Sequence, residues 1–165
     1  HNQLRTDYAP AKVMEAMNRG LSLTLHDFRL MTCCFIVLDP LAKSLTYCNA
    51  GHTPPYHFSR QARQLQRLMP TDLLLGMPNA ENARFGNSET CWQPGDILVM
   101  YSDGITEAQN SQEEEFGHER LEAVLLKSVD EPPPRIIESI FDAVSRHSDR
   151  SKQDDDITLV VARAL

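Results

Sequence analysis

Gly-Asp-Ile-Leu-Val-Met-Tyr-Ser-Asp-Gly-Ile-Thr-Glu, residues 95–107, is the strongest structural signal in the chain. Four consecutive apolar residues, 97–100, follow the turn dipeptide Pro94-Gly95 and predict a strand that is buried on both faces. The strand ends at Ser102-Asp103-Gly104, where glycine permits a positive φ and a close backbone approach. Asp103 is therefore either a metal ligand on a rigid element or a solvated residue in an Asp-Gly turn.

A second aspartate-rich strand end lies near the C-terminus. Three consecutive aspartates stand directly before the strand-like run 157–161, namely Asp154, Asp155 and Asp156. Adjacent carboxylates repel each other, so the cluster is either a solvated turn or a place where a cation neutralises the charge. Together with Asp103 it indicates a hard-cation site, for which Mg²⁺ or Mn²⁺ fits better than Zn²⁺. If the two strands are neighbours in one sheet, Asp155 comes to lie beside Asp103.

The remaining pattern predicts a single α+β domain, 1–165. Helices are expected from Ala9-Pro10, with Gly20 and the polar pair His26-Asp27 ending the element, and over 118–129 and 133–147, because apolar residues recur at spacings of three and four. Proline at or before the first helical turn supports the first and last of these. Strands are expected at 30–38, 43–48, 56–58, 88–92 and 156–162, with the first two paired as a hairpin.

Composition limits the function. The chain is 41% hydrophobic and 24% charged, as in a globular domain, and its net charge of −7 argues against general nucleic-acid binding. No apolar run reaches the roughly 20 residues that a membrane span needs. Four cysteines in strand-like stretches, without Cys-x-x-Cys spacing, favour reduced side chains and a cytoplasmic location: Cys33, Cys34, Cys48 and Cys91. Because the chain starts at His1, we expect it to be a piece of a longer protein.

A turn motif, Asn49-Ala50-Gly51-His52-Thr53-Pro54-Pro55, follows the second strand of the hairpin. The small residues allow a tight turn, and the two prolines stiffen the exit. His52 could donate a proton or contact a phosphate, or it could stabilise the turn by hydrogen bonds. We favour the structural role because no acid or nucleophile is adjacent in the sequence.

Five motifs in this order resemble a known family. They are the turn 49–55, Leu75-Gly76-Met77, the stretch from Pro94-Gly95-Asp96 to Ala108, Glu115-Phe116-Gly117 and Asp155-Asp156-Ile157-Thr158. Their order and spacing resemble the bacterial PPM (type 2C-like) metal-dependent serine phosphatases. The subgroup is that of stage II sporulation protein E and sigma-B regulator U, and the resemblance covers residues 9–163.

The resemblance implies an antiparallel β-sandwich flanked by helices, with two Mn²⁺ or Mg²⁺ ions that activate a water to hydrolyse a phosphoserine. It implies that Asp103 and Asp155 are metal ligands and that no catalytic residue is needed beyond such ligands. Asp156, Gly104 and His52 are candidate supporting residues, of which Gly104 would act through close backbone approach. The absence of a Gly-x-Ser-x-Gly or similar nucleophile motif agrees with attack by a metal-activated water.

The chain departs from the family pattern in one respect. Two upstream motifs of the family, Gly-Asp-x-x-Asp and Gly-Asp-x-Ser-Gly-x-Gly, do not occur in these 165 residues. The chain would therefore be the C-terminal two thirds of the domain, with its N-terminal strands missing, and we expect little or no activity from it alone. The family implies a phosphorylated substrate of the anti-sigma factor antagonist type and an upstream sensory or receiver domain. The alternatives are a non-catalytic, partner-binding module and a phosphoesterase that acts on small molecules.

Overall fold

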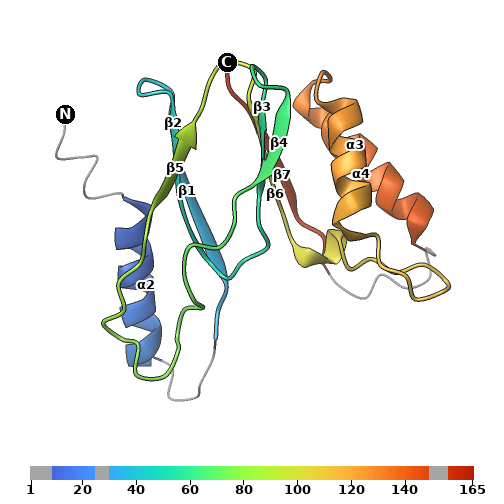
Figure 1. Ribbon diagram of the computed structural model, residues 1–165. Helices are drawn as coiled ribbons and strands as arrows, with labels where there is room; N and C mark the ends of the chain where they lie inside the picture. Colours follow the sequence, from blue (N-terminus) through green and yellow to red (C-terminus); the bar gives the residue numbers. More distant parts are fainter. Residues whose placement is uncertain (1–8, 25–29, 149–155) are drawn as a thin grey trace. The chain divides into compact units, whose positions relative to one another are not determined.

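The computed structural model describes residues 9–24, 30–148 and 156–165 (Figure 1). The chain forms two compact units, one from residues 1–54 and 68–93 and the other from residues 55–67 and 94–165. Each unit contains one antiparallel sheet together with helix, so the predicted α+β class is confirmed. No helix of the described ranges is long and apolar enough to cross a membrane.

The first unit has a three-stranded sheet. Its strands are β1 (Cys33–Asp39), β2 (Ser44–Ala50) and β5 (Ser88–Cys91), in the order β1-β2-β5. The predicted hairpin is confirmed, with Phe35 opposite Cys48 in the register of β1 and β2. The first strand begins at Cys33 and not at residue 30, because the backbone of Met31 is hydrogen-bonded to that of Leu75 instead.

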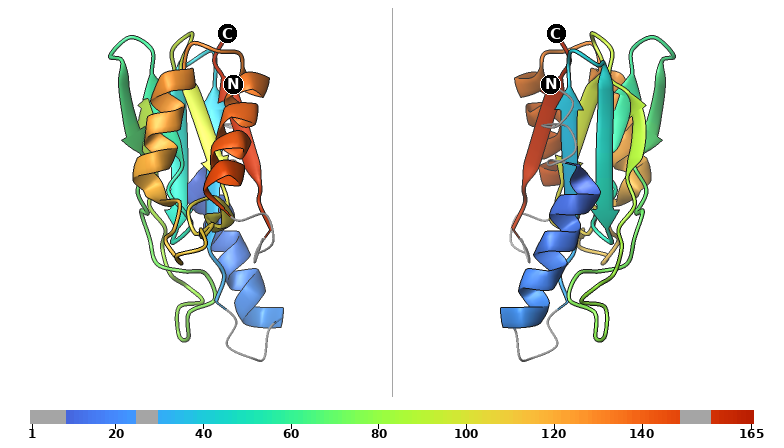
Figure 2. Two further views of the ribbon diagram at one scale, coloured as in Figure 1. Left: turned by 90° about the vertical axis from the view of Figure 1, so that its right-hand side faces the viewer. Right: turned by 90° about the vertical axis from the view of Figure 1, so that its left-hand side faces the viewer.

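Helix α2 (Pro10–Thr24) packs against β1 and β2 and is visible along the sheet in Figure 2. Met14 contributes to a small core with Cys48, Ala50 and Leu75. The prediction that Gly20 helps to end the helix is wrong, since the helix continues to Thr24, and the predicted end at His26-Asp27 lies outside the described residues. A lone helical glycine costs only about 1 kcal/mol relative to alanine, which the packed face of α2 can offset.

The second unit has a four-stranded sheet with β6 in its interior. The strands are β3 (Tyr56–Ser59), β4 (Gln64–Arg67), β6 (Ile97–Tyr101) and β7 (Leu159–Arg163), in the order β4-β3-β6-β7. Both neighbours of β6 are antiparallel to it. Four of the five residues of β6 are buried, which confirms the strand predicted from its apolar run.

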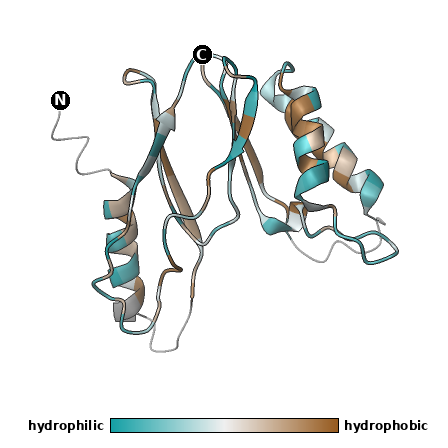
Figure 3. Ribbon diagram, in the orientation of Figure 1, coloured by the Kyte–Doolittle hydropathy of each residue, from teal (hydrophilic) through white to brown (hydrophobic). Residues whose placement is uncertain are grey.

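Two helices cover this sheet, α3 (Gly117–Ser128) and α4 (Pro133–His147), close to their predicted limits. Their apolar stripes are visible as brown segments in Figure 3. Leu121, Leu125, Ile136, Ile140 and Val144 form one core with Ile97 and Val99 of β6. The guanidinium of Arg163 in β7 donates to the carbonyls of Val129 and Glu131, so it satisfies backbone acceptors that follow the end of α3.

The four cysteines are free, in agreement with the predicted reduced state. Burial raises the pKa of Cys34 to about 12 and that of Cys48 to about 11. These two thiols therefore stay protonated near neutral pH and behave as small apolar core residues.

Leu125 and Leu126 provide a matched test of the core of the second unit. They are adjacent on α3, with side chains 2% and 49% exposed. We expect Leu125→Ala to lower the free energy of unfolding by about 2–5 kcal/mol, because it leaves a cavity in the core. Leu126→Ala should cost less than about 1 kcal/mol. Urea unfolding of both variants measures the difference, and equal losses would contradict the assignment of this helix face to the core.

Candidate metal site at the end of β6

Asp103 begins a short 3-10 helix, η1 (Asp103–Ile105), that follows β6 directly. Its carbonyl oxygen accepts hydrogen bonds from the Glu107 N–H at 2.8 Å and the Thr106 hydroxyl at 3.1 Å. Its side chain is exposed, and no hydrogen bond or ion pair to it occurs among the described residues. The backbone of Asp103 is thus held while its carboxylate faces solvent, as a ligand for a hard cation must be.

Ser102 joins this turn to the segment that precedes β7. Its hydroxyl donates to the Asp156 carbonyl at 3.0 Å and accepts from the Thr158 N–H at 2.9 Å. Its backbone N–H also donates to the Thr158 carbonyl, at 3.0 Å. These bonds explain why β7 begins at Leu159 and not at the predicted Asp156: the Asp156 carbonyl and the Thr158 N–H bind the serine hydroxyl instead of backbone groups of a neighbouring strand.

Gly104 lies against the same segment. A Cβ atom at this position would come within 2.8 Å of the Asp156 carbonyl oxygen, closer than side chains pack. Gly104 is not among the glycines with a positive φ, so of the two properties of glycine considered at this position only the close backbone approach applies. Glycine is required here because two backbones meet, as the supporting role predicted for Gly104 implied.

The structure brings Asp103 and Asp156 to neighbouring positions, since Asp156 contacts Ser102 and Gly104. Asp155, the second predicted ligand, lies outside the described residues, as does Asp154. Carboxylate oxygens on an exposed strand end suit Mg²⁺ or Mn²⁺. No group of three or more metal-binding side chains occurs within the described ranges, so these ranges supply only part of a ligand set.

His52, the remaining candidate, belongs to the first unit. Its Nδ1 lies 3.2 Å from the Thr32 hydroxyl. The buried Asn49 side chain accepts from the His52 N–H at 2.8 Å and donates to the His52 carbonyl at 3.1 Å. Gly51 has a φ of +67°, which favours glycine. Hydrogen bonds of the turn therefore account for the local structure around His52.

Sequence reasoning missed a group of side chains in the second unit, which we call the tyrosine cluster: Tyr56, Arg67, Tyr101, His118 and Glu122. The rings of Tyr56 and Tyr101 stack with centroids 5.7 Å apart. Tyr56 donates to Glu122 at 2.9 Å, and both hydroxyls approach Nδ1 of His118, at 3.4 and 3.3 Å. The spacing of His118 and Glu122, four residues on one helix, was the available signal.

The cluster keeps both tyrosines neutral. Burial raises the pKa of Tyr101 to about 12, and burial together with the neighbouring Tyr101 and Glu122 raises the pKa of Tyr56 further. Burial opposes ionisation of Glu122, but hydrogen bonds from Arg67 and Tyr56 outweigh it and lower the pKa of that carboxyl. A charged Glu122 thus accepts from Arg67 and from the Tyr56 hydroxyl.

The other end of β6 is held by a buried pair. Nε2 of His57 lies 3.3 Å from a carboxylate oxygen of Asp96, and the other oxygen accepts from the Arg60 N–H at 2.8 Å. Because Asp96 directly precedes β6, these contacts join the start of the strand to the hairpin of β3 and β4. Neither side chain is exposed enough to meet a substrate, so we assign the pair a structural role.

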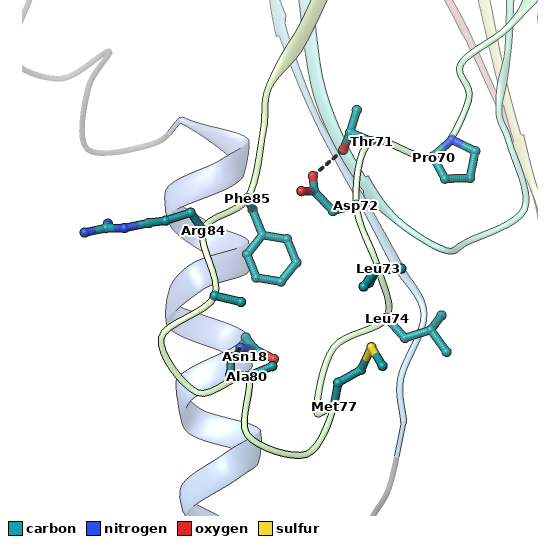
Figure 4. Close-up of a pocket in the computed structure, with 11 residues that line it drawn as sticks. Asn18, Pro70, Thr71, Asp72, Leu73, Leu74, Met77, Ala80, Arg84 and Phe85 are labelled. Carbon is teal, nitrogen blue, oxygen red and sulfur yellow. Dashed lines mark hydrogen bonds between the residues drawn. The ribbon is translucent and has the colours of Figure 1, made fainter.

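A separate pocket of about 450 Å³ lies in the first unit (Figure 4). Its lining is mostly apolar, including Leu74, Met77 and Phe85. One Asp72 carboxylate oxygen already accepts from the Thr71 hydroxyl at 2.7 Å and from the Gly86 N–H at 3.0 Å. Among the described residues, Asp72 is the one acidic side chain in the lining, so the pocket lacks the second carboxylate that the predicted metal site needs.

Comparison with known proteins assigns the family. The sequence profile of stage II sporulation protein E (SpoIIE) matches residues 1–165. Protein IcfG of Synechocystis sp. is 33% identical over 129 residues, which is 78% of this chain and 20% of that protein. Phosphoserine phosphatase RsbU of Bacillus subtilis is 22% identical over 158 residues, 96% of this chain and 46% of that protein. The chain thus spans less than half the length of either relative.

Solved structures share the fold. The SiaA-PP2C domain of Pseudomonas aeruginosa superposes with a TM-score of 0.80 at 20% identity, covering 94% of this chain and 61% of that one. The catalytic domain of the serine threonine protein phosphatase PstP, in complex with two manganese ions, gives a TM-score of 0.59 at 16% identity, over 94% and 71% of the two chains. The predicted resemblance is confirmed: the chain belongs to the stage II sporulation protein E (SpoIIE) family and has the fold of PP2C-type phosphatase domains.

Proposed function

We propose that this chain is part of a metal-dependent serine/threonine phosphoprotein phosphatase that hydrolyses a phosphoserine by means of a metal-activated water. Membership of the SpoIIE family supports the reaction class. The observation that carries the proposal is local: the residue after Asp155 is hydrogen-bonded to Ser102 and lies against Gly104, the two neighbours of Asp103. Asp103 and Asp156, which are far apart in the sequence, therefore lie next to the paired ends of β6 and β7, and Asp155 directly precedes Asp156 in the sequence.

The residues of the chain have distinct roles in this proposal. Asp103 and Asp155 would hold divalent Mn²⁺ or Mg²⁺, with Asp156 beside them. Ser102 and Gly104 fix the two strand ends relative to each other, so the carboxylates need little reorganisation on binding. A bound divalent ion supplies a nucleophile by lowering the pKa of its water and neutralises charge on the phosphate. The exposed position of Asp103 leaves room for a phosphorylated segment of another protein.

The finer assignments follow from the same family. We infer a substrate of the anti-sigma factor antagonist type, an upstream sensory or receiver domain and a cytoplasmic reaction. The name of one relative, phosphoserine phosphatase RsbU, supports the phosphoserine. We also infer that the two units are parts of one phosphatase domain whose remaining ligands come from an upstream segment.

A second candidate is a non-catalytic module that binds a phosphorylated partner without hydrolysis. Its signature would be the absence of the two upstream aspartate motifs, which these 165 residues do not contain, from the full-length gene product as well. A phosphatase that has lost part of its ligand set would retain the fold and the docking surface. Sequencing the coding region upstream of His1 discriminates between the two, because an enzyme needs further aspartates there.

Asp103→Asn and Asp155→Asn test the proposal in the full-length gene product that contains this chain. Each change removes a charged ligand while keeping the shape of the side chain, so we expect at least a hundredfold loss of Mn²⁺-dependent phosphate release from a phosphoserine protein. Asp130→Asn is the matched control, since that exposed carboxylate pairs with Arg60 and Arg63. Its activity should stay within about twofold of wild type.

Three results would count against the enzyme assignment. Full activity of Asp103→Asn would remove this residue from the ligand set. An inactive wild-type protein that still binds the phosphoprotein would support the non-catalytic module. Release of phosphate from p-nitrophenyl phosphate but from no phosphoprotein would indicate an esterase for small molecules.

Gly104→Ala tests the close contact between the strand ends. The added methyl would meet the Asp156 carbonyl at 2.8 Å, so we expect a loss of about 1–3 kcal/mol in the free energy of unfolding and weaker Mn²⁺ binding. Gly20→Ala is the control, because nothing lies within 4 Å of a Cβ there and a helical alanine should stabilise by about 0.5–1 kcal/mol. Thermal unfolding with and without Mn²⁺ compares them. An unchanged Gly104→Ala protein would contradict the contact.

A further inference from the structure

Asp103 lies in the short segment of residues 102–105, which we call the bridge. The residues on either side of it, Tyr101 and Thr106, both contact the start of α3. On one side, the hydroxyl oxygen of Tyr101 is 3.3 Å from Nδ1 of His118. On the other side, the Gly117 N–H donates to the Thr106 carbonyl at 2.8 Å. Because residues 117 and 118 are consecutive, the whole bridge of residues 102–105 is fixed to one point of the helix.

The first turn of α3 is itself a firm support. Leu121 and Leu125 bury the helix in the core of the second unit. The Phe116 N–H donates to the Ala108 carbonyl at 2.8 Å, which closes the loop of residues 109–115 between the bridge and α3. A shift of Asp103 would therefore need either a movement of α3 or the loss of its contacts to residues 101 and 106.

The side chain of His118 is held by the rest of the tyrosine cluster. Arg67 donates to one oxygen of Glu122 through Nε at 2.9 Å and through a terminal nitrogen at 2.6 Å. The Tyr56 hydroxyl donates its single proton to that same oxygen, so toward His118 it can act only as an acceptor. The cluster thus forms a continuous path from β4 through α3 to the last residue of β6.

The two tyrosines differ in one decisive respect. Both are buried, with 1% and 3% of their surface exposed, and both approach the same nitrogen of His118. Tyr101 precedes Asp103 by two residues on the same strand end, whereas Tyr56 belongs to β3. Loss of the Tyr101 hydroxyl would remove one of the two attachments of the bridge, while loss of the Tyr56 hydroxyl would leave both in place.

We propose that Tyr101 and His118 are positioning residues that hold the Asp103 carboxylate in its metal-binding orientation, an inference that rests on the proposed role of Asp103 as a ligand. They act through the backbone of residues 102–105 and touch neither metal nor substrate. The arrangement is comparable to outer-shell contacts at metal sites, which orient ligands and are often as important as the ligands themselves. A site whose support is loose binds its ion weakly even when every ligand is present.

The experiment compares Tyr101→Phe with Tyr56→Phe in the full-length gene product. Each variant removes one buried hydroxyl from the same cluster. The first readout, which needs no metal, is amide hydrogen exchange at Ile105 and Glu107, whose N–H groups donate to the carbonyls of Ser102 and Asp103. We expect Tyr101→Phe to exchange about fivefold faster at these amides and Tyr56→Phe to match wild type there.

The second readout is the affinity for Mn²⁺, measured by calorimetry without substrate. Tyr101→Phe should weaken binding about tenfold, the lower end of what loss of an outer-shell contact costs, and Tyr56→Phe by less than about twofold. His118→Leu should reproduce the effect of Tyr101→Phe in both readouts. Because the two side chains act as one contact, the double variant should show little further loss.

Equal changes in the two tyrosine variants, in either readout, would overturn the proposal and leave the cluster a purely structural role. Unchanged exchange in both Tyr101→Phe and His118→Leu would do the same. A wild-type protein that does not bind Mn²⁺ would instead refute the proposed function. The hydrogen-exchange comparison would still decide whether Tyr101 and His118 hold the bridge.

Discussion

The hydrogen bonds between Ser102 and residues 156–158 are the constraint on which the candidate site depends. A serine hydroxyl can donate once and accept as well, and here it does both, toward the Asp156 carbonyl and the Thr158 N–H. Backbone hydrogen bonds to a neighbouring strand would have satisfied the same carbonyl and N–H, but β7 would then have begun before Leu159. The serine instead ends the ladder and leaves two acidic strand ends side by side, with Gly104 as the residue that allows the approach.

This constraint is effective because β6 is rigid at both ends. Asp96 anchors its start through His57 and the Arg60 N–H, and Tyr101 anchors its end through His118. A single hydrogen bond contributes only about 1 kcal/mol net, whereas burial of the apolar residues of the strand contributes several times that. Apolar packing therefore provides most of the stability of β6, and the hydrogen bonds at its two ends determine where Asp103 lies.

Much of this could be predicted from the sequence, since apolar runs and spacings report burial directly. The buried strand was predicted at 97–100 from its apolar run and helix 133–147 from its periodicity, and the motifs identified the family. The start of β7 and the backbone segment that Gly104 contacts could not be predicted, because both depend on a contact between residues more than fifty positions apart. The tyrosine cluster was not predicted for the same reason: β3, β4 and β6 contribute one residue each to it, and only α3 contributes two.

The central claim is that the carboxylates of Asp103 and Asp155 share a divalent ion at the end of β6. The most direct measurement is a crystal structure of the full-length gene product with Mn²⁺, with the ion located by its anomalous scattering. The account predicts a manganese peak within about 2 Å of a carboxylate oxygen from each residue, the distance typical of small divalent ions and oxygen ligands. A peak elsewhere, or side chains of Asp103 and Asp155 that point away from each other, would contradict it.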